Sequence, residues 1–470
     1  MRPFRSGMKG DIIDCKEGIQ GVVGMNMKER AIDIFNEALK AVDPYEAVKR
    51  HGTFLEALYR QGGFKAVTIA AFGKAAFAMA RAVADQFDAV IGGGIVITKY
   101  GHSHKGILSA RIEVYEAGHP VPDENGVAAT KQVVELLAAA GRNTLVICLV
   151  SGGGSSLLVA PAEPLSLAEK QTVTRLLLQS GADITELNTV RKHLSCVKGG
   201  RLAEIAYPAQ VVSLVLSDVI NDRIDVIASG PTAPDESTYG DALRVLDRYG
   251  LARKVPQNVH EALATGAEGK RPETPKTGNP LFAVVQNTVV GSNRMAIRAA
   301  EKRAVELGFD TAIVTSELHG EARERGQWLA RVALEQLSGS GDSAAGAICL
   351  VSGGETTVTV RGNGLGGRNM ELAVSFAMEI EGVRGITLLS AGTDGTDGPT
   401  DAAGGIVDGE TTRKARACGF APESCLANND SYHLLERVGD LFITGPTGTN
   451  VMDLQIVLID HTQPVGPPNS

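Results

Sequence analysis

Aromatic residues and long apolar runs are both scarce in this chain. Phe, Trp and Tyr make up 4% of its 470 residues, with a single tryptophan. No apolar run approaches the roughly 20 residues that a membrane-spanning helix needs. The first two dozen residues are interrupted by charges and lack the apolar centre of a signal peptide. Membrane and secreted classes are therefore not expected, and the sequence predicts a cytoplasmic protein.

Excess positive charge and paired cysteine motifs are missing as well. The formal net charge is −8, whereas a nucleic-acid binder is usually basic. An anionic small substrate stays open, because local lysines and arginines decide its binding. The six cysteines show no CxxC spacing, and two lie inside predicted buried strands. They are therefore expected to be reduced core residues.

Three common catalytic signatures are also absent. There is no GxxxxGK[ST] phosphate loop and no GxGxxG after the first strand with an acid at the right distance. The run Gly-Gly-Gly-Ser-Ser lacks the GxSxG spacing of a hydrolase elbow. These absences disfavour a simple P-loop enzyme, a simple dinucleotide oxidoreductase and a Ser-His-Asp hydrolase. A nucleophilic Ser155 or Ser156 stays possible, but a serine that cradles phosphate is the simpler interpretation.

What the chain does have is glycine, 55 residues in all, and enough length for two hydrophobic cores. Strand-like and helix-like segments alternate, which predicts an α/β fold. The polar segment 266–280 has three prolines and three glycines and is the best linker. We expect a loose extension over 1–27, a larger domain over 28–265, a smaller domain over 281–460 and a loose tail over 461–470.

One heptapeptide occurs twice. Ile147–Gly153 and Ile348–Gly354 both read ICLVSGG, and each begins as a buried strand. The first copy continues with Gly154, Ser155 and Ser156, which suit phosphate. The second continues with Glu355, which would repel phosphate unless a metal or base intervened. Chance is the alternative, but the repeat predicts two comparable strand ends that face one cleft.

Two basic residues follow glycines at strand-to-helix turns. Lys74 comes after the predicted strand 67–72, and Arg368 comes after four glycines and opens a helix. Helix N-termini and nearby cations attract anions. An exposed lysine in solvent is the alternative for Lys74. For Arg368 we expect an anion site formed together with the helix N-terminus.

Two aspartates follow predicted strands. Asp218 comes two residues after the strand 211–216. Asp394 lies in the Gly-Thr-Asp-Gly segment after the strand 385–390. The carboxyl ends of parallel strands are where α/β folds bind ligands. Mg²⁺ takes one or two carboxylates together with phosphate oxygens. A plain Asp-Gly turn is the alternative for Asp394.

Taken in order, these motifs resemble the class II glycerate kinases, also known as the MOFRL family, many of which were once labelled hydroxypyruvate reductases. The resemblance spans residues 28–460. The motifs that carry it are Gly73-Lys74-Ala75, Gly118-His119-Pro120, SGGGSSLL, Asn188 to Leu202, Ser217-Asp218-Val219, Ser229-Gly230-Pro231-Thr232, SGGET, GLGGRNMEL and GTDGTDGPTDAAG.

The resemblance implies a larger Rossmann-like three-layer α/β/α N-terminal domain and a smaller α/β C-terminal domain, with the active site in the cleft between them. It implies ATP- and Mg²⁺-dependent phosphorylation of D-glycerate, at the 2-hydroxyl, to 2-phosphoglycerate. By motif, the catalytic residues would be Lys74, Asp218, Arg368 and Asp394.

The residue types agree with phosphoryl transfer, which needs positioning and charge neutralisation. Lys74 and Arg368 would hold the glycerate carboxylate and the transferred phosphoryl, with the order left open. Asp218 or Asp394 would orient the acceptor hydroxyl or bind Mg²⁺. The expected phosphate- and substrate-binding residues are Ser151, Gly152, Gly153, Gly154, Ser155, Ser156, Asn287, Ser352, Gly353 and Glu355.

Two rival functions remain. An NAD(P)H-dependent hydroxypyruvate reductase would need a dinucleotide fingerprint, which the sequence lacks. A non-catalytic nucleotide- or sugar-acid-binding protein would bind ligand without turnover, and the spread of acids and bases argues against it. Neither a nucleic acid nor a membrane partner is expected, and the sequence leaves a homodimer open.

Overall fold

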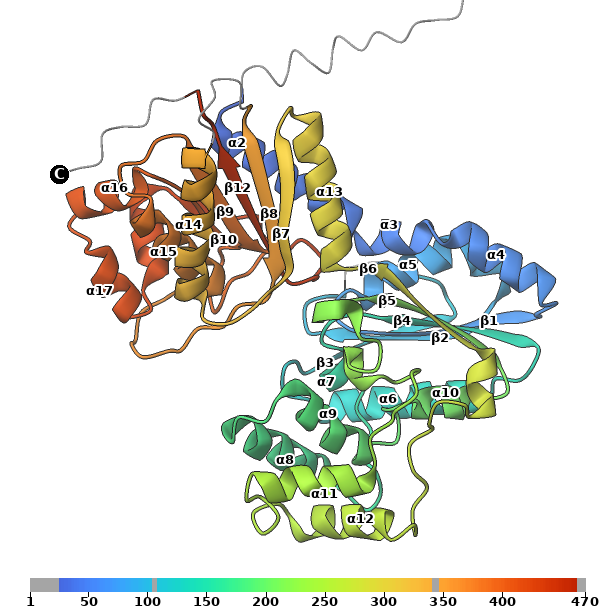
Figure 1. The fold of residues 1–470 in the computed structure, drawn as a ribbon. Helices are drawn as coiled ribbons and strands as arrows, with labels where there is room; N and C mark the ends of the chain where they lie inside the picture. The colour runs from blue at the N-terminus through green and yellow to red at the C-terminus, as the bar shows by residue number, and fades with distance from the viewer. Residues whose placement is uncertain (1–24, 104–107, 340–345, 463–470) are drawn as a thin grey trace, which may run out of the picture.

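The computed structural model describes residues 25–103, 108–339 and 346–462. Almost all of the predicted loose extension and of the predicted tail lies outside these residues. The described chain forms two six-stranded sheets, each with helices on both faces (Figure 1). The predicted two-domain α/β architecture is therefore confirmed.

The first sheet is parallel throughout and has the strand order of a Rossmann fold, 3-2-1-4-5-6. Its central strands are buried on both faces, which explains their near-continuous apolar sequences. From edge to edge the strands are β3 (Ile112–Ala117), β2 (Ile91–Lys99), β1 (Ala66–Phe72), β4 (Thr144–Val150), β5 (Gln210–Leu216) and β6 (Val285–Gly291).

Helices cover both faces of this sheet (Figure 1). One face carries α3 (Pro44–Lys49), α4 (Gly52–Gln61) and α5 (Ala76–Phe87), and the other carries α6 (Glu124–Ala138) and α10 (Arg201–Ala206). The predicted three-layer arrangement is thus present.

A helical lobe extends from the lower face of the first domain (Figure 1). It has a hydrophobic core of its own, which includes Val173, Leu187, Val190 and Leu246. The sequence indicated individual helices here but not a separate cluster. The lobe consists of α8 (Leu167–Gln179), α9 (Ile184–His193), α11 (Tyr239–Arg248) and α12 (Gln257–Ala267).

The second sheet is mixed. β7 and β8 are parallel, and the remaining neighbours are antiparallel. In order across the sheet, the strands are β11 (Leu441–Phe442), β10 (Gly404–Asp408), β9 (Ile386–Gly392), β12 (Asp453–Ile459), β8 (Ile348–Gly354) and β7 (Asp310–Leu318).

Helices also lie on both faces of the second sheet. α2 (Met27–Ala41) and α13 (Asn293–Glu306) pack together on one face. The other face carries α14 (Ala322–Gly339) and α15 (Arg368–Glu379), with α16 (Thr411–Ala417), α17 (Pro422–Ala427) and α18 (Ser431–Val438) around α15.

The predicted domain boundaries need correction at both ends. Helix α2 belongs to the second domain, where Asp33 pairs with Arg303 at 2.7 Å. The strand expected to open the second domain at 281–285 is instead a 3₁₀ turn followed by β6, which pairs with β5 in the first sheet. The chain therefore crosses between domains twice, near Val42 and near Ser292. Sequence pattern could not show this, because pairing across the fold decides it.

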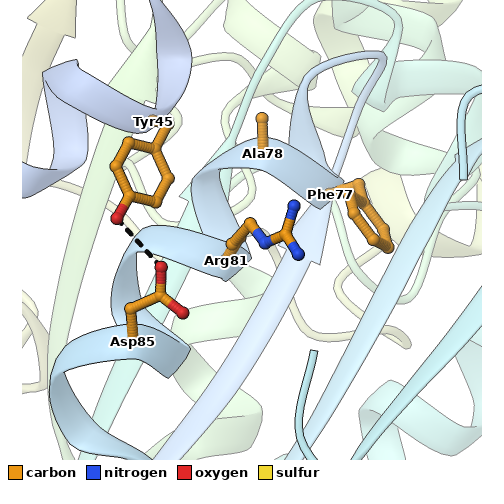
Figure 2. Close-up of a pocket in the computed structure, with 5 residues that line it drawn as sticks. All are labelled: Tyr45, Phe77, Ala78, Arg81 and Asp85. Carbon is orange, nitrogen blue, oxygen red and sulfur yellow. Dashed lines mark hydrogen bonds between the residues drawn. The ribbon is translucent and has the colours of Figure 1, made fainter. Parts of the chain in front are cut away.

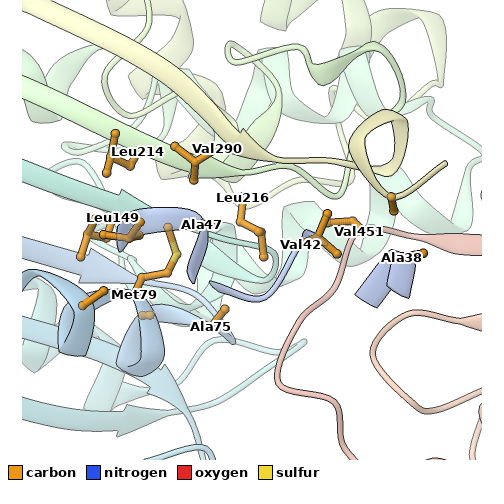
Figure 3. Packing of buried hydrophobic residues seen from close by; sticks show 14 of the residues in the cluster. Ala38, Val42, Ala47, Ala75, Met79, Leu149, Leu214, Leu216, Val290 and Val451 are labelled. Carbon is orange, nitrogen blue, oxygen red and sulfur yellow. The ribbon is translucent and has the colours of Figure 1, made fainter. Parts of the chain in front are cut away.

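The two domains share one hydrophobic cluster at these crossings. Val42 lies beside Val451, and Leu216 faces them from the first sheet (Figure 3). The Thr449 hydroxyl donates to the Val42 carbonyl at 2.8 Å. The crossings are therefore packed rather than exposed linkers. In the described part of the chain, no helix combines the length and the hydrophobicity that a bilayer span requires.

Candidate active site

The strand order of the first sheet reverses between β1 and β4, which is where Rossmann-type sheets bind ligands. Lys74 follows β1 and the Gly-rich loop follows β4. The Lys74 amide donates to the Gly152 carbonyl at 2.9 Å, and the Ala75 amide donates to the Ser151 hydroxyl at 3.1 Å. The two predicted motifs are therefore bonded to each other at the expected crevice.

Neighbouring side chains leave no room for a β-carbon at Gly152 or Gly153. A β-carbon on Gly152 would come within 2.4 Å of an Asp218 carboxylate oxygen. Gly153 has φ = 81°, and a β-carbon there would come within 2.8 Å of the His119 ring and 3.4 Å of the Lys74 side chain. The glycines thus let Lys74, Asp218 and His119 converge on the loop backbone.

The three predicted serines of the loop have different environments. Ser151 is 1% exposed and accepts the Ala75 amide, so it shapes the turn. Ser156 is buried and donates to the Gly153 carbonyl. Ser155 lines the cleft, and its hydroxyl is 2.8 Å from that of Ser229. Only Ser155 is therefore placed to meet a ligand through its side chain.

A buried amine supports this loop from below. The Lys198 ammonium, fully buried, donates to the carbonyls of Ser155 at 2.8 Å, Leu158 at 3.3 Å and Ala228 at 3.5 Å. The motif Asn188 to Leu202, which contains Lys198, is rich in basic residues, a pattern typical of a phosphate contact or a solvated helix face. Lys198 is instead a loop support, and burial lowers its pKa well below the usual value.

We expect Lys198→Met to lower the free energy of unfolding by about 1–3 kcal/mol, because three buried carbonyls would lose their donor. The loosened loop should also raise the KM for ATP several-fold. Urea unfolding and steady-state kinetics would measure the two effects. The matched control is Lys170→Met, because among the described residues the buried Lys170 bonds only to the Leu194 carbonyl. It should lose stability but keep the KM, and an equal KM change in both variants would contradict the loop-support role.

The second domain contributes a buried arginine–carboxylate pair. β12 runs antiparallel between β8 and β9, which sets Asp453 beside the ends of both strands. Arg368 donates to the two carboxylate oxygens of Asp453 at 2.6 and 2.9 Å, and reaches Glu355 at 2.9 Å. Asp453 was missed from the sequence, because no local motif marks it and only the strand order places it here.

Two opposing effects act on the pKa values of this group. Burial raises the pKa of Asp453, while Arg368 opposes the shift. Burial by itself would lower the pKa of Arg368, but the hydrogen bonds and charges of Asp453 and the charge of Glu355 raise it above its usual value. Burial also raises the pKa of Glu355, although its side chain is 45% exposed toward the cleft.

The anion site expected at the N-terminus of α15 is occupied by the protein itself. The Asp397 carboxylate accepts the amides of Asn369 at 3.2 Å and Met370 at 2.8 Å, and it is 2% exposed. Arg368 is likewise already bound by carboxylates. The expectation of a free anion site at this helix end was therefore wrong, because the Gly-Thr-Asp-Gly loop folds back to cap the helix.

Asp394 and Asp218 approach Lys74 from different domains. Asp394 lies 3.6 Å from the Lys74 ammonium and accepts the amide and hydroxyl of Thr396. Asp218 forms no ion pair within 4 Å in the described residues. Burial raises its pKa, and the charge of Lys74 opposes the shift. Lys74 thus lies near carboxylates from both domains.

Two neighbouring cavities open at this point. The larger, of about 640 Å³, is bounded by both domains and the helical lobe and includes both repeat ends, through Gly153, Ser155 and Glu355. The smaller, of about 220 Å³, includes Lys74 and Asp394. The prediction that the two ICLVSGG copies face one cleft is confirmed. In the first copy the last three residues turn, whereas in the second they stay in β8.

A third pocket, of about 530 Å³, adjoins the smaller cavity through Phe77 and Ala78. Figure 2 shows its remaining lining, Tyr45, Arg81 and Asp85, with the Tyr45 hydroxyl donating to Asp85 at 2.9 Å. It contains none of the residues predicted from the sequence.

Three predicted site residues lie in the framework and not in these cavities. Asn287, in β6, accepts the Thr232 hydroxyl at 2.7 Å. Ser352 is 1% exposed and donates to Gln455. At Gly353 a β-carbon would collide with Asn293. Each supports a neighbouring element, which a sequence pattern cannot distinguish from ligand contact.

His119 was identified only within a motif of the family resemblance, and the structure brings it to the glycine loop. Burial lowers the pKa of His119 from 6.5 to about 4, and the charge of Lys74 adds to the effect. The imidazole is therefore neutral near pH 7.

This lowered pKa predicts a pH dependence of stability. Between pH 6.5 and 4 the unfolded state binds the additional proton, so the contribution of His119 is complete above pH 6.5 and is lost as the pH falls through 4. We expect the urea midpoint of the wild type to fall more between pH 7 and 5 than that of His119→Gln. His260→Gln, in the helical lobe, is the control and should behave like the wild type. Equal pH slopes in all three proteins would contradict the assignment.

No cluster of three or more His, Cys, Asp or Glu residues suited to a metal exists among the described residues. A magnesium ion held by one or two carboxylates and by the phosphates of a nucleotide would not need such a cluster. Asp218, which has no ion-pair partner in the described structure and faces the larger cavity, has the chemistry of such a ligand.

Comparison with known proteins agrees with this geometry. Residues 30–264 match a family model described as a domain of unknown function (DUF4147), and residues 348–453 match the MOFRL family model. A D-glycerate 2-kinase of Thermotoga maritima is 48% identical over 434 residues, covering 92% of this chain and 99% of the relative. The chain belongs to the MOFRL-type glycerate kinase family.

One solved structure shows the same fold as this chain, and one relative has a name that implies another activity. The crystal structure of a glycerate kinase from Thermotoga maritima superposes with a TM-score of 0.82 at 48% identity, over 92% of this chain and 99% of that one. A relative from Agrobacterium vitis, 40% identical over 91% of this chain and 93% of its own length, is provisionally named a hydroxypyruvate reductase. The family resemblance seen in the motifs is confirmed.

Proposed function

We propose that this chain transfers the γ-phosphoryl group of ATP to the 2-hydroxyl of D-glycerate, giving 2-phosphoglycerate and ADP. The new bond joins the glycerate oxygen to phosphorus, the bond to the β-phosphate oxygen breaks, and the hydroxyl proton passes to a carboxylate. The observation that carries the proposal is the position of Lys74, at the switch point of a Rossmann-type sheet and between carboxylates from two domains.

The carboxylates divide the work in this scheme. Asp394, held by Thr396 and beside Lys74, orients the acceptor hydroxyl and accepts its proton. Asp218, which lines the larger cavity, would hold Mg²⁺. The metal, when bound, neutralises phosphate charge during transfer. Under this proposal, Asp394 is the base and Asp218 is the metal ligand.

The two basic residues also differ in role. Lys74 is paired at a loose 3.6 Å and faces the transferred phosphoryl group. Arg368 is held by the carboxylates of Asp453 and Glu355, so we assign it a positioning role. It would fix the part of the second domain that borders the larger cavity. The amide of Gly153, with the Ser155 hydroxyl, contacts nucleotide phosphates.

Reduction of hydroxypyruvate is the alternative that the strand order and the name of one relative support. Against it, β1 is followed by Gly73-Lys74-Ala75-Ala76 and not by a dinucleotide glycine fingerprint. Two assays on the wild type separate the functions. We expect D-glycerate-dependent release of ADP from ATP, and no oxidation of NADH or NADPH by hydroxypyruvate. A non-catalytic binding protein would do neither.

The cellular location and the binding partners are also part of this proposal. We propose a cytoplasmic enzyme, supported by five described cysteines that are all free. D-Glycerate, ATP and Mg²⁺ are its small-molecule partners, and a homodimer is a proposal that size measurement in solution would test.

A further inference from the structure

The cations around the larger cavity differ in whether a carboxylate accompanies them. Arg223 pairs with Asp225 at 2.6 Å. Arg368 pairs with Asp453 and with Glu355, which lines the cavity. Arg191 also lines this cavity. Its guanidinium makes no hydrogen bond or ion pair with any described residue, and its Nε is buried without a partner. A half-buried arginine without an anion is costly in a folded protein, which points to a ligand.

The groups around Arg191 do not offer it a countercharge. The Lys170 and Lys198 amines lie nearby, and within the described residues both bond to backbone carbonyls. Burial lowers the pKa of Arg191 to about 10, with no carboxylate acting against this shift. Helix α9, which carries Arg191, is held by the separate core of the helical lobe. The lobe therefore presents an uncompensated cation to the cleft.

The two cavities suit different substrates. The larger offers six apolar side chains, which suit a nucleobase and ribose, together with Ser155 and the Gly-rich loop for phosphates. The smaller, of about 220 Å³, has Lys74, Lys99 and Asp394 and suits a small hydroxy acid. Lys74 lies at the border between them. The apolar side chains of the larger cavity are Ile184, Val219, Ile220, Val226, Ala228 and Met452.

We propose that Arg191 binds a phosphate group of the nucleotide in the larger cavity, and that the smaller cavity receives the acceptor acid. This assignment rests on the proposed kinase function and adds the donor subsite to it. The guanidinium would bind phosphate oxygens in the paired geometry that arginine favours.

The test is Arg191→Met, with Arg175→Met as the control for loss of one charge on an exposed residue of the neighbouring helix α8. Calorimetric titration with MgADP, without acceptor, should show at least a tenfold weaker Kd for Arg191→Met and no change for the control. The KM for D-glycerate at saturating ATP should stay within about twofold. Without ligand, the Tm of Arg191→Met should equal or exceed that of the wild type, since a buried unpaired charge is removed.

Two results would overturn the assignment. One is an unchanged Kd for MgADP in Arg191→Met. The other is a tenfold rise in the KM for D-glycerate with an unchanged Kd, which would place the acceptor carboxylate at Arg191. The titration needs no turnover, so it separates this proposal from the choice of acceptor. A wild type that binds no MgADP would contradict the kinase function itself, and this assignment with it.

Discussion

Replacing Lys74 with methionine is expected to lower kcat for ATP-dependent phosphorylation of D-glycerate about a hundred- to a thousandfold, the usual effect of losing one preorganised charge contact in a transition state. The Lys74 backbone is fixed by the hydrogen bond from its amide to the Gly152 carbonyl, and its side chain lies over Gly153. We therefore expect it to meet the transferred group without rearrangement.

The physical reason lies in the two carboxylates that Lys74 separates. Without the ammonium, Asp394 and Asp218 would face the phosphoryl oxygens with no compensating charge. Stability should change little, because the Asp394 side chain is 27% exposed and can be hydrated. The effect should therefore appear in kcat and not in unfolding.

Steady-state kinetics with saturating ATP would measure this effect. Lys131→Met is the control, since Lys131 lies on α6 with a side chain that is 75% exposed and only a loose contact to Glu135. It should keep wild-type turnover. A Lys74→Met protein with kcat within threefold of the wild type would remove Lys74 from the reaction.

Replacing Arg368 with methionine is expected to lower the free energy of unfolding by about 3–5 kcal/mol at pH 7, because it strands the buried Asp453 carboxylate. The loss should shrink at lower pH. Burial already raises the pKa of Asp453 in the folded state, and removing Arg368 takes away an effect that opposes this. The folded variant would thus hold a proton that the unfolded chain releases, and stability would recover as the pH falls.

The rescue variant is Arg368→Met combined with Asp453→Asn, which removes the stranded charge. Urea unfolding at pH 7 and 5 should show most of the lost stability restored in the double variant. Turnover should stay low in both, because the wall around Glu355 has lost its support. A free energy of unfolding for Arg368→Met within about 1 kcal/mol of the wild type at pH 7 would show that the Arg368–Asp453 pair does not stabilise the fold.

The first sheet and the loops at its switch point could be predicted from sequence because their signals are local. Buried parallel strands read as apolar runs, and glycines followed by Lys74 or by serines mark strand-to-helix turns. The repeat even indicated that Gly153 and Glu355 would share a cleft.

What escaped prediction depends on pairing between distant segments. The carboxylate that holds Arg368 comes from Asp453, 85 residues away, through the antiparallel insertion of β12 between β8 and β9. The placement of α2 against the second sheet and of β6 in the first also depends on tertiary packing. The unpaired state of Arg191 is a further example, since a basic stretch in sequence does not show which cations find partners.

The measurement that bears most directly on the account is a coupled assay that joins ATP and D-glycerate to enolase without any mutase. Enolase accepts 2-phosphoglycerate directly and does not accept 3-phosphoglycerate. We predict immediate formation of the enolase product, dependent on ATP, on D-glycerate and on an intact Lys74. Product that appears only after a phosphoglycerate mutase is added, or no product while hydroxypyruvate oxidises NADH, would contradict phosphorylation of D-glycerate at its 2-hydroxyl.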